Sequence, residues 1–273
     1  MLNYTALLVL GAIAGFTIYF GLAFSKVSVM KAQSRLMMSA VAAGILTFLI
    51  FDVLQGSWSV VEDSFITSIS AGTSLNNPIL YLAVFMIGLS LGSIGLSAYE
   101  RVFIASMARK SSKHDENTIL GNSSYRLALM IAIGIGAHNF GEGLAIGQSY
   151  SSGAIALALV LVIGFGLHNS TEGFGICGPL VRESGTPRTS FLILAGLIGG
   201  GPTFLGTVIG SFWVSEIAKV LFLSFAAGAL IYVTFTMYRS IASQMSGNRI
   251  FVGLFIGVAL GFLTDLVVTI GGV

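Results

Sequence analysis

The sequence predicts an all-α integral membrane protein with eight transmembrane helices, arranged as an inverted-topology repeat around a central antiparallel pair. Composition is the first indication, because 55% of the 273 residues are hydrophobic and only 9% are charged, against about 25% charged residues in soluble domains. The second indication is eight apolar runs, each near the roughly 20 residues that a bilayer-spanning helix needs. They cover 4–24, 36–56, 78–100, 125–148, 153–180, 189–212, 214–238 and 250–271. We expect one transmembrane domain over residues 1–273.

Two connections between these runs are longer and more polar than the others. Residues 57–77 contain Glu62 and Asp63 and are predicted to form a loop outside the membrane. Residues 101–124 carry many charges and are predicted to form a cytoplasmic loop between spans three and four. No basic segment precedes the first run, so we interpret that run as a mature helix rather than a cleaved signal.

The basic residues are distributed unevenly between the two sides of such a bundle. Of 13 Lys and Arg, only Lys219 falls on the side that carries both termini. The other 12 are Lys26, Lys31, Arg35, Arg101, Arg109, Lys110, Lys113, Arg126, Arg182, Arg188, Arg239 and Arg249. The positive-inside rule makes their side the cytoplasm, so we expect a multi-pass plasma-membrane protein with both termini extracellular. The net charge of +2 gives no reason to expect a nucleic-acid partner.

Internal similarity predicts the inverted repeat. Residues 11–21, GAIAGFTIYFG, match 196–206, GLIGGGPTFLG, with the same glycine spacing, and 42–48, AAGILTF, resemble 226–232, AAGALIY. Spans one to three are therefore predicted to be equivalent to spans six to eight. Because the offset of five spans is odd, equivalent helices cross in opposite directions, a pattern typical of secondary transporters. Spans four and five form the third pair.

A short motif occurs in both central spans, 30 residues apart. It reads HNFGEG at 138–143 and HNSTEG at 168–173. A histidine and a glutamate four residues apart project from one helix face, so two such faces offer two imidazoles and two carboxylates. This set suits a divalent transition metal, and placing it in apolar helices is costly enough to indicate a function. The candidate metal ligands are His138, Asn139, Glu142, His168, Asn169 and Glu172.

Three further features qualify this metal site. The asparagine oxygens either ligate the ion or orient a ligand. The single cysteine, Cys177, excludes a disulfide framework and a thiolate cluster, and a site without thiolates suits an ion that must leave again. The two motifs face each other at equal depth if the turn between them centres near residue 155, whereas the polar turn signal covers 148–153.

With these motifs, the chain resembles a prokaryotic-type member of the ZIP (Zrt-, Irt-like protein) family of divalent metal transporters over essentially its whole length. HNFGEG and HNSTEG are similar to the family's His-Asn-x-Pro-Glu-Gly and His-x-x-Pro-Glu-Gly. The resemblance implies that the six candidate ligands form the transport site. It also implies a homodimer in which spans one, four, five and six move against spans two, three, seven and eight.

The sequence departs from the family pattern at several positions. Gly141 and Thr171 replace the two motif prolines. Gly201 precedes the span-six proline, where members with two bridged metals carry a glutamate, so we expect a single metal. Thr236 and Met237 occupy the span-seven stretch where an acid is expected.

Four of the acidic residues outside the motifs, and the one remaining histidine, also have predicted roles. The resemblance implies that Asp52 takes the place of the family's histidine or acid in span two. With Glu62 and Asp63 it is expected to form either an acidic vestibule or part of a solvated loop. Asp265 is expected to reach water at the end of span eight by snorkelling. His114 in the cytoplasmic loop is interpreted as part of a solvated charged turn, with a regulatory metal site as the alternative.

These observations favour import of a divalent metal into the cytoplasm by alternating access. Zn²⁺ is the first candidate, with Fe²⁺, Mn²⁺, Cd²⁺ and Co²⁺ as alternatives, and the metal is expected as substrate rather than as a resident cofactor. An intramembrane zinc-dependent hydrolase is the alternative, because a His/Glu-bound Zn²⁺ can activate water. The lack of an HExxH sequence and the symmetry of the two motifs argue against any enzyme. A cation-coupled carrier of an organic solute is a third, weaker hypothesis.

Overall fold

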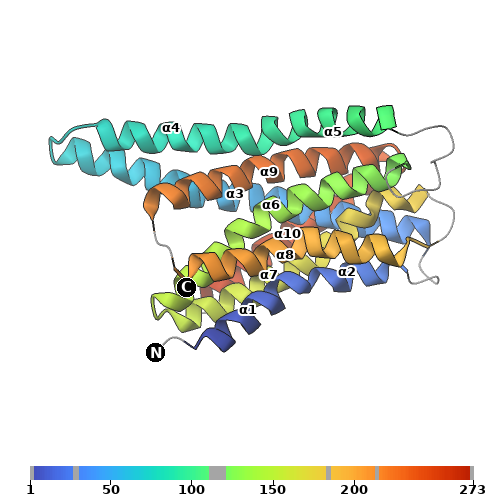
Figure 1. Cartoon of the computed structure of the whole chain (residues 1–273), viewed down its shortest axis with the longest axis horizontal. Coiled ribbons are helices and arrows are strands. Elements are labelled where there is room, and N and C mark those ends of the chain that lie inside the picture. The colour runs from blue at the N-terminus through green and yellow to red at the C-terminus, as the bar shows by residue number, and fades with distance from the viewer. Residues whose placement is uncertain (1–2, 27–30, 111–120, 183–185, 213–214, 271–273) are drawn as a thin grey trace.

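The computed structural model describes residues 3–26, 31–110, 121–182, 186–212 and 215–270, which form a bundle of long helices (Figure 1). Within these ranges eight helical segments are long and apolar enough to cross a membrane, and no strand occurs. The elements are α1 (Tyr4–Phe16), α2 (Ile18–Phe24), α3 (Ala32–Ser70), α4 (Asn76–Ser90), the π-helical turn η1 (Leu91–Gly95), α5 (Leu96–Lys110), α6 (Ser123–Ser151), α7 (Ile155–Cys177), the 3₁₀ turn η2 (Gly178–Arg182), α8 (Thr189–Gly210), α9 (Glu216–Ala242) and α10 (Gly247–Ile270). The prediction of an all-α protein with eight membrane-spanning helices is confirmed.

Helix α3 is longer than a bilayer requires, and the loop predicted over 57–77 is wrong for most of its length. The helix continues to Ser70, and the turn to α4 contains Gly72 with φ 63°. The segment 57–70 has no glycine or proline. Val61 is fully buried against Phe85 and Val220. Loss of hydropathy marks where a helix leaves the membrane, whereas a packed face and a lack of breakers decide where it ends.

Two other boundaries differ from expectation. Helix α5 continues to Lys110, inside the segment that we predict as a cytoplasmic loop, and the part of that segment around His114 lies outside the described residues. The α6–α7 turn comprises residues 152–154 rather than the expected polar stretch, because α6 continues through Ser151 and Gly153 takes φ 84°. Because this turn lies later in the chain than the expected one, the two motifs lie closer to the same depth in the bundle than a turn at 148–153 would place them.

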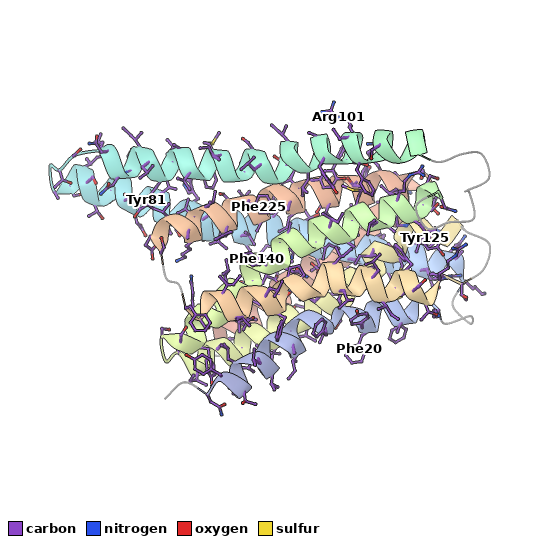
Figure 2. All side chains as sticks on the ribbon, in the orientation of Figure 1. Phe20, Tyr81, Arg101, Tyr125, Phe140 and Phe225 are labelled. Carbon is purple, nitrogen blue, oxygen red and sulfur yellow. The ribbon has the colours of Figure 1, made fainter. Side chains whose placement is uncertain are left out.

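The helices form two groups that pack mainly within themselves. Helices α1, α2, α6, α7 and α8 form the first group, and α3, α4, η1, α9 and α10 form the second. Contacts of α6 with α9 and of α3 with α7 join the groups. Figure 1 shows α1 and α2 along one side of the bundle and α4 and α5 along the opposite side. Large apolar side chains such as that of Phe20 point away from the bundle, as lipid-facing residues do (Figure 2).

The two ends of the bundle are distinct. The first turn of α1, the last turn of α10 and the α6–α7 turn lie at one end, which we call the terminal end (Figure 1). The end of α2, the start of α6 and the end of α5 lie at the opposite end, which we call the loop end. Arg101 lies within α5, in the half of the bundle toward the loop end (Figure 2).

Glycines bring several helix pairs into backbone contact. A Cβ atom added at Gly15 of α1 would lie 2.3 Å from the carbonyl oxygen of Gly200 of α8, and one at Gly200 would lie 2.1 Å from that of Gly15. The absence of a side chain therefore allows the close packing. Four further glycine pairs make such contacts: Gly21 with Gly173, Gly143 with Gly206, Gly44 with Gly257, and Gly92 with Gly228. The inverted repeat stays a prediction.

Candidate metal site

The antiparallel packing of α6 on α7 brings the two motifs together in crossed pairs. His168 Nε2 lies 2.5 Å from Glu142 Oε1, and His138 Nε2 lies 3.1 Å from Glu172 Oε1. Within α6, His138 Nε2 is 3.5 Å from Glu142 Oε1. Each imidazole therefore faces the carboxylate of the opposite helix, and these contacts link all four side chains in one chain of interactions.

These four side chains are almost completely removed from solvent. Their exposed fractions are 0% for His138, 6% for Glu142, 6% for His168 and 1% for Glu172. Burying ionisable groups in an apolar membrane interior is costly unless they pair or bind a metal. The cluster is therefore not a solvated face, and its burial makes it a candidate functional site.

The spacing of the donor atoms fits a transition-metal ion. His138, Glu142 and His168 each present one ligand atom, and these three atoms lie within 4.8 Å of one another. Ligands about 2.0 Å from a tetrahedral ion lie about 3.3 Å apart, so the 2.5–3.5 Å separations in the cluster bracket that spacing. Glu172 lies outside this set of three and joins it through His138.

The two asparagines take different places. Asn139 Nδ2 donates to Glu172 Oε2 at 3.2 Å and to the carbonyl oxygen of Gly199 at 3.0 Å. Asn169 Nδ2 donates to the carbonyl oxygen of Ala14 at 3.0 Å. Asn139 thus holds a carboxylate of the cluster in place, whereas Asn169 ties α7 to α1. The sequence offers no signal for the two carbonyl partners, because any residue supplies a backbone oxygen.

Acceptor atoms remain unsatisfied at the site. Glu142 Oε2, Asn139 Oδ1 and Asn169 Oδ1 are buried without a hydrogen-bond partner. Buried polar atoms are normally satisfied, and leaving one unpaired costs about 1–3 kcal/mol. The free carboxylate oxygen of Glu142, within the cluster, is compatible with a bound cation.

The two motif helices are continuous at Gly141 and Thr171, the positions that depart from the expected motif. Helix α6 passes through Gly141 and α7 through Thr171 without a break. The Thr171 hydroxyl donates to the carbonyl oxygen of His168 at 2.7 Å within the same helix. Both copies of the motif therefore keep the i, i+4 geometry that places histidine and glutamate on one face.

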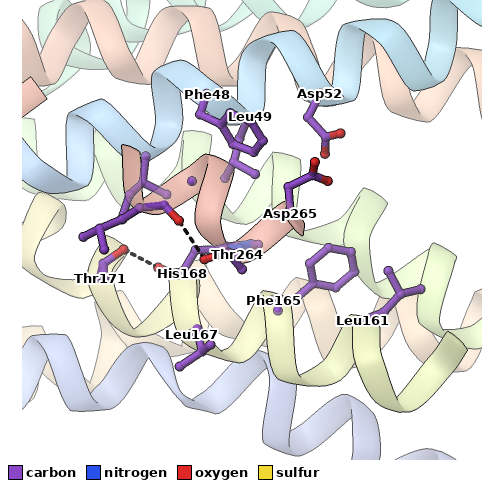
Figure 3. A pocket seen from close by; sticks show the side chains of 14 residues that line it. Phe48, Leu49, Asp52, Leu161, Phe165, Leu167, His168, Thr171, Thr264 and Asp265 are labelled. Atoms are coloured by element: carbon purple, nitrogen blue, oxygen red, sulfur yellow. Dashed lines mark hydrogen bonds between the residues drawn. The ribbon is translucent and has the colours of Figure 1, made fainter. Parts of the chain in front are cut away.

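A cavity of about 430 Å³ adjoins the site at His168 (Figure 3). It lies between α3, α7 and α10, and its lining includes His168, Phe165, Leu161, Asp52 and Asp265. Figure 3 shows the two aspartates facing each other above the ring of Phe165. Asp265 therefore lines a cavity next to the site, which the snorkelling interpretation did not anticipate. Glu62 and Asp63 do not line this cavity.

An eight-span helical bundle around a buried cluster of imidazoles and carboxylates defines a membrane protein that handles metal cations. The family model of the ZIP zinc transporter matches residues 104–269. The chain belongs to this family and transports divalent metal cations, so it is a transporter and not an enzyme. The hydrolase alternative is thereby wrong. No curated protein matches the chain.

Proposed function

We propose that the chain imports a divalent transition-metal ion, Zn²⁺ before Fe²⁺, Mn²⁺, Cd²⁺ or Co²⁺, into the cytoplasm by alternating access. A single ion binds between α6 and α7, held by the imidazoles and carboxylates of His138, Glu142, His168 and Glu172. The observation that carries this proposal is the crossed pairing of these side chains in an apolar interior. Two carboxylates balance the charge of a dication and so reduce the cost of burying all of them. The ion is the substrate, and no resident cofactor is involved.

The asparagines have supporting roles in this proposal. Asn139 orients Glu172 through its amide nitrogen. Its Oδ1 has no hydrogen-bond partner and is free to bind the ion directly. Asn169 fixes the position of α7 against α1. Removing a partner that orients a metal ligand typically lowers metal affinity about 10- to 100-fold.

The described conformation gives the site access from one side only. The cavity beside His168 leads toward the terminal end. On the loop-end side of His138, the side chains of Ile131 and Ile135 are fully buried. We therefore assign this conformation to the state that is open outward, and transport requires a second conformation in which the other side opens.

The packing pairs support an inverted repeat that supplies this second conformation. Spans one and five meet at Gly21 and Gly173, and the equivalent spans six and four meet at Gly206 and Gly143. Spans two and eight, and the equivalent spans seven and three, meet through two further glycine pairs. Repeats related in this way can exchange their packing arrangements, which opens the site alternately to the two sides.

Orientation and assembly complete the proposal. We propose that the loop end lies in the cytoplasm and that both termini lie outside the plasma membrane, and the uneven distribution of the basic residues supports this orientation. We propose a homodimer in which the group α1, α2, α6, α7 and α8 moves against the group α3, α4, η1, α9 and α10. Each group packs mostly within itself, and this packing supports the division.

Uptake of radioactive zinc or manganese into proteoliposomes tests the proposal. We expect saturable uptake by the native chain, and near-background uptake by a variant combining His138→Ala with Glu172→Ala. Glu62→Ala is the matched control, because it removes an exposed carboxylate distant from the site. Uptake by the double variant at the native rate would contradict the assignment of the site.

A further inference from the structure

A second cavity, of about 290 Å³, lies at the loop end of the bundle, where α5, η2 and α9 meet the start of α6. Polar side chains of three of these elements line it, and they include Glu100, Ser123, Ser124, Thr236 and Arg239. None of them belongs to the candidate metal site, whose donors come from the middle of α6 and α7. The cavity lies at the lower limit of the roughly 300–1,000 Å³ usual for ligand sites, so it suits a small ligand.

One acidic and one basic side chain line this cavity without pairing with each other. They are Glu100 of α5 and Arg239 of α9, and no ion pair joins them among the described residues. The guanidinium carbon of Arg239 instead lies 5.9 Å from the centre of the Phe235 ring. Opposite charges that stay apart in one cavity fit a ligand that itself carries both charges, because each side chain then gains the partner that it lacks.

The start of α6 reinforces the positive side of the cavity. Ser123 and Ser124 are the first two of the 29 residues of this helix, and a helix N-terminus carries a partial positive charge that attracts phosphate. The Asn122 side chain already accepts from the amides of Ser124 and Tyr125, so the helix offers its partial charge and its serine hydroxyls. Arg239 and Ser123 are exposed, and this side of the cavity is therefore open. A guanidinium, two hydroxyls and a helix N-terminus suit a phosphate group.

The opposite side of the cavity is more deeply buried and suits an ammonium group. Thr236 is 8% exposed, and Glu100 is partly buried. Beside them lies Tyr232, which is 7% exposed and whose buried hydroxyl has no hydrogen-bond partner. Buried polar atoms are normally paired, so this hydroxyl indicates a missing partner. A primary ammonium has three N–H donors, and the carboxylate and the two hydroxyl oxygens offer three acceptors.

We infer that this cavity binds a zwitterion of the phosphoethanolamine type, with its ammonium on Glu100 and Tyr232 and its phosphate on Arg239 and the start of α6. A phosphate alone would meet the carboxylate of Glu100, and an ammonium alone would leave Arg239 without a partner. Pockets between membrane helices on the cytoplasmic side are known places for lipid headgroups. The same chemistry has two sources, the headgroup of phosphatidylethanolamine and free phosphoethanolamine.

Calorimetric titration of the purified chain in detergent with three short-chain lipids tests this inference. Phosphatidylethanolamine carries both groups, phosphatidylglycerol lacks the ammonium, and phosphatidylcholine has a quaternary ammonium without N–H donors. We expect phosphatidylethanolamine to bind about tenfold more tightly than either of the others, as for the loss of one charged hydrogen-bonded contact. Equal affinities for the three lipids would overturn the inference, because they would indicate a surface that recognises no particular headgroup.

Substitutions at the two ends of the cavity should change lipid selectivity in different ways. Glu100→Gln should weaken phosphatidylethanolamine about tenfold without weakening phosphatidylglycerol, whereas Arg239→Gln should weaken both about tenfold. Tyr232→Phe, which keeps the ring and removes the hydroxyl, should weaken phosphatidylethanolamine about threefold. Native affinity in both Glu100→Gln and Arg239→Gln would overturn the inference.

Matched controls separate these effects from general changes in charge or folding. Glu216→Gln and Arg249→Gln remove exposed charges that do not line the cavity, and both should bind the lipids as the native chain does. Native helicity by circular dichroism checks folding in every variant. Loss of phosphatidylethanolamine binding in the controls as well as in Glu100→Gln and Arg239→Gln would overturn the site, because the effect would then follow total charge.

Titration with free phosphoethanolamine distinguishes the two sources. Binding of both compounds, each weakened by Glu100→Gln, supports recognition of the headgroup alone. Binding of the lipid only supports a lipid site, and binding of phosphoethanolamine only supports a soluble ligand. Binding of neither would overturn the inference. Failure of the proposed function would appear separately, as absence of metal uptake by the native chain, and would leave these titrations unchanged.

Discussion

His138 of α6 pairs with Glu172 of α7 at 3.1 Å, closer than the 3.5 Å to Glu142 on its own helix. The candidate metal site is therefore a property of the helix pair, since each histidine depends on the opposite helix for its nearest carboxylate. Any movement of α6 against α7 would separate donors that a bound ion needs together. This relationship explains why the same motif occurs twice in the chain.

Removal of donor atoms should lower metal affinity in graded steps. His138→Ala deletes a ligand in the centre of the cluster, and we expect no measurable Zn²⁺ binding by calorimetry in detergent. Asn139→Ala removes only the hydrogen bond that orients Glu172, and we expect affinity to fall about 10- to 100-fold. Equal losses for the two variants would contradict the separate roles assigned to them. Native helicity by circular dichroism is the folding control.

Metal binding should weaken in acid. A bound metal requires neutral imidazole and ionised carboxylate, so binding releases protons and added protons compete with the ion. We expect Zn²⁺ affinity to fall by more than tenfold between about pH 7.5 and about pH 5.5, the range in which unperturbed histidines become charged. Titration of the purified protein at several pH values measures this change. A pH-independent affinity would argue against histidine ligands.

The outer aspartates should affect access rather than the maximal rate. Asp52 and Asp265 line the cavity that leads to His168, and their negative charge concentrates cations near the site. We expect Asp265→Asn to raise the Zn²⁺ concentration for half-maximal uptake about tenfold at low salt. The effect should shrink as ionic strength rises, because salt screens exposed charges.

Glu216→Gln is the matched control for this experiment, because Glu216 is an exposed carboxylate at the start of α9 that does not line the cavity. If Asp265→Asn and Glu216→Gln change half-saturation equally, the cavity has no special role in attracting the ion.

Close glycine contacts should be sensitive to one added methyl group. A Cβ atom at Gly143 would lie 2.1 Å from the carbonyl oxygen of Thr203, so Gly143→Ala forces α6 away from α8. We expect a loss of about 1–3 kcal/mol in stability, as for other overpacked interiors. Gly201→Ala is the control, since nothing lies within 4 Å of its added Cβ. Alanine is favoured over glycine in helices by about 1 kcal/mol, so thermal unfolding in detergent should show opposite shifts for the two variants.

The sequence predicted the spans and the paired motif because both depend on local patterns. Apolar runs report membrane crossing directly, and four-residue spacing places His138 and Glu142 on one face whatever the surrounding fold. The crossed pairing could not be read from sequence, because it depends on the turn at 152–154 and on the depth of α7 against α6.

Three features were missed for different physical reasons. The extension of α3 to Ser70 depends on packing of Val61 against other helices, which hydropathy does not record. The carbonyl partners of the asparagines, on Gly199 and Ala14, are backbone atoms that no residue type reveals. Asp265 was visible as an acid in an apolar helix, but only the placement of α10 beside α3 brings it to Asp52.

The most direct test of the central claim is anomalous diffraction from crystals of the native chain soaked in Zn²⁺ or Cd²⁺. We predict one strong peak between α6 and α7, within bonding distance of His138 Nε2, His168 Nε2 and a carboxylate oxygen of Glu142. The peak should disappear in Glu142→Gln combined with Glu172→Gln. A native map with no peak among these side chains, or with its only ion bound elsewhere, would contradict the account.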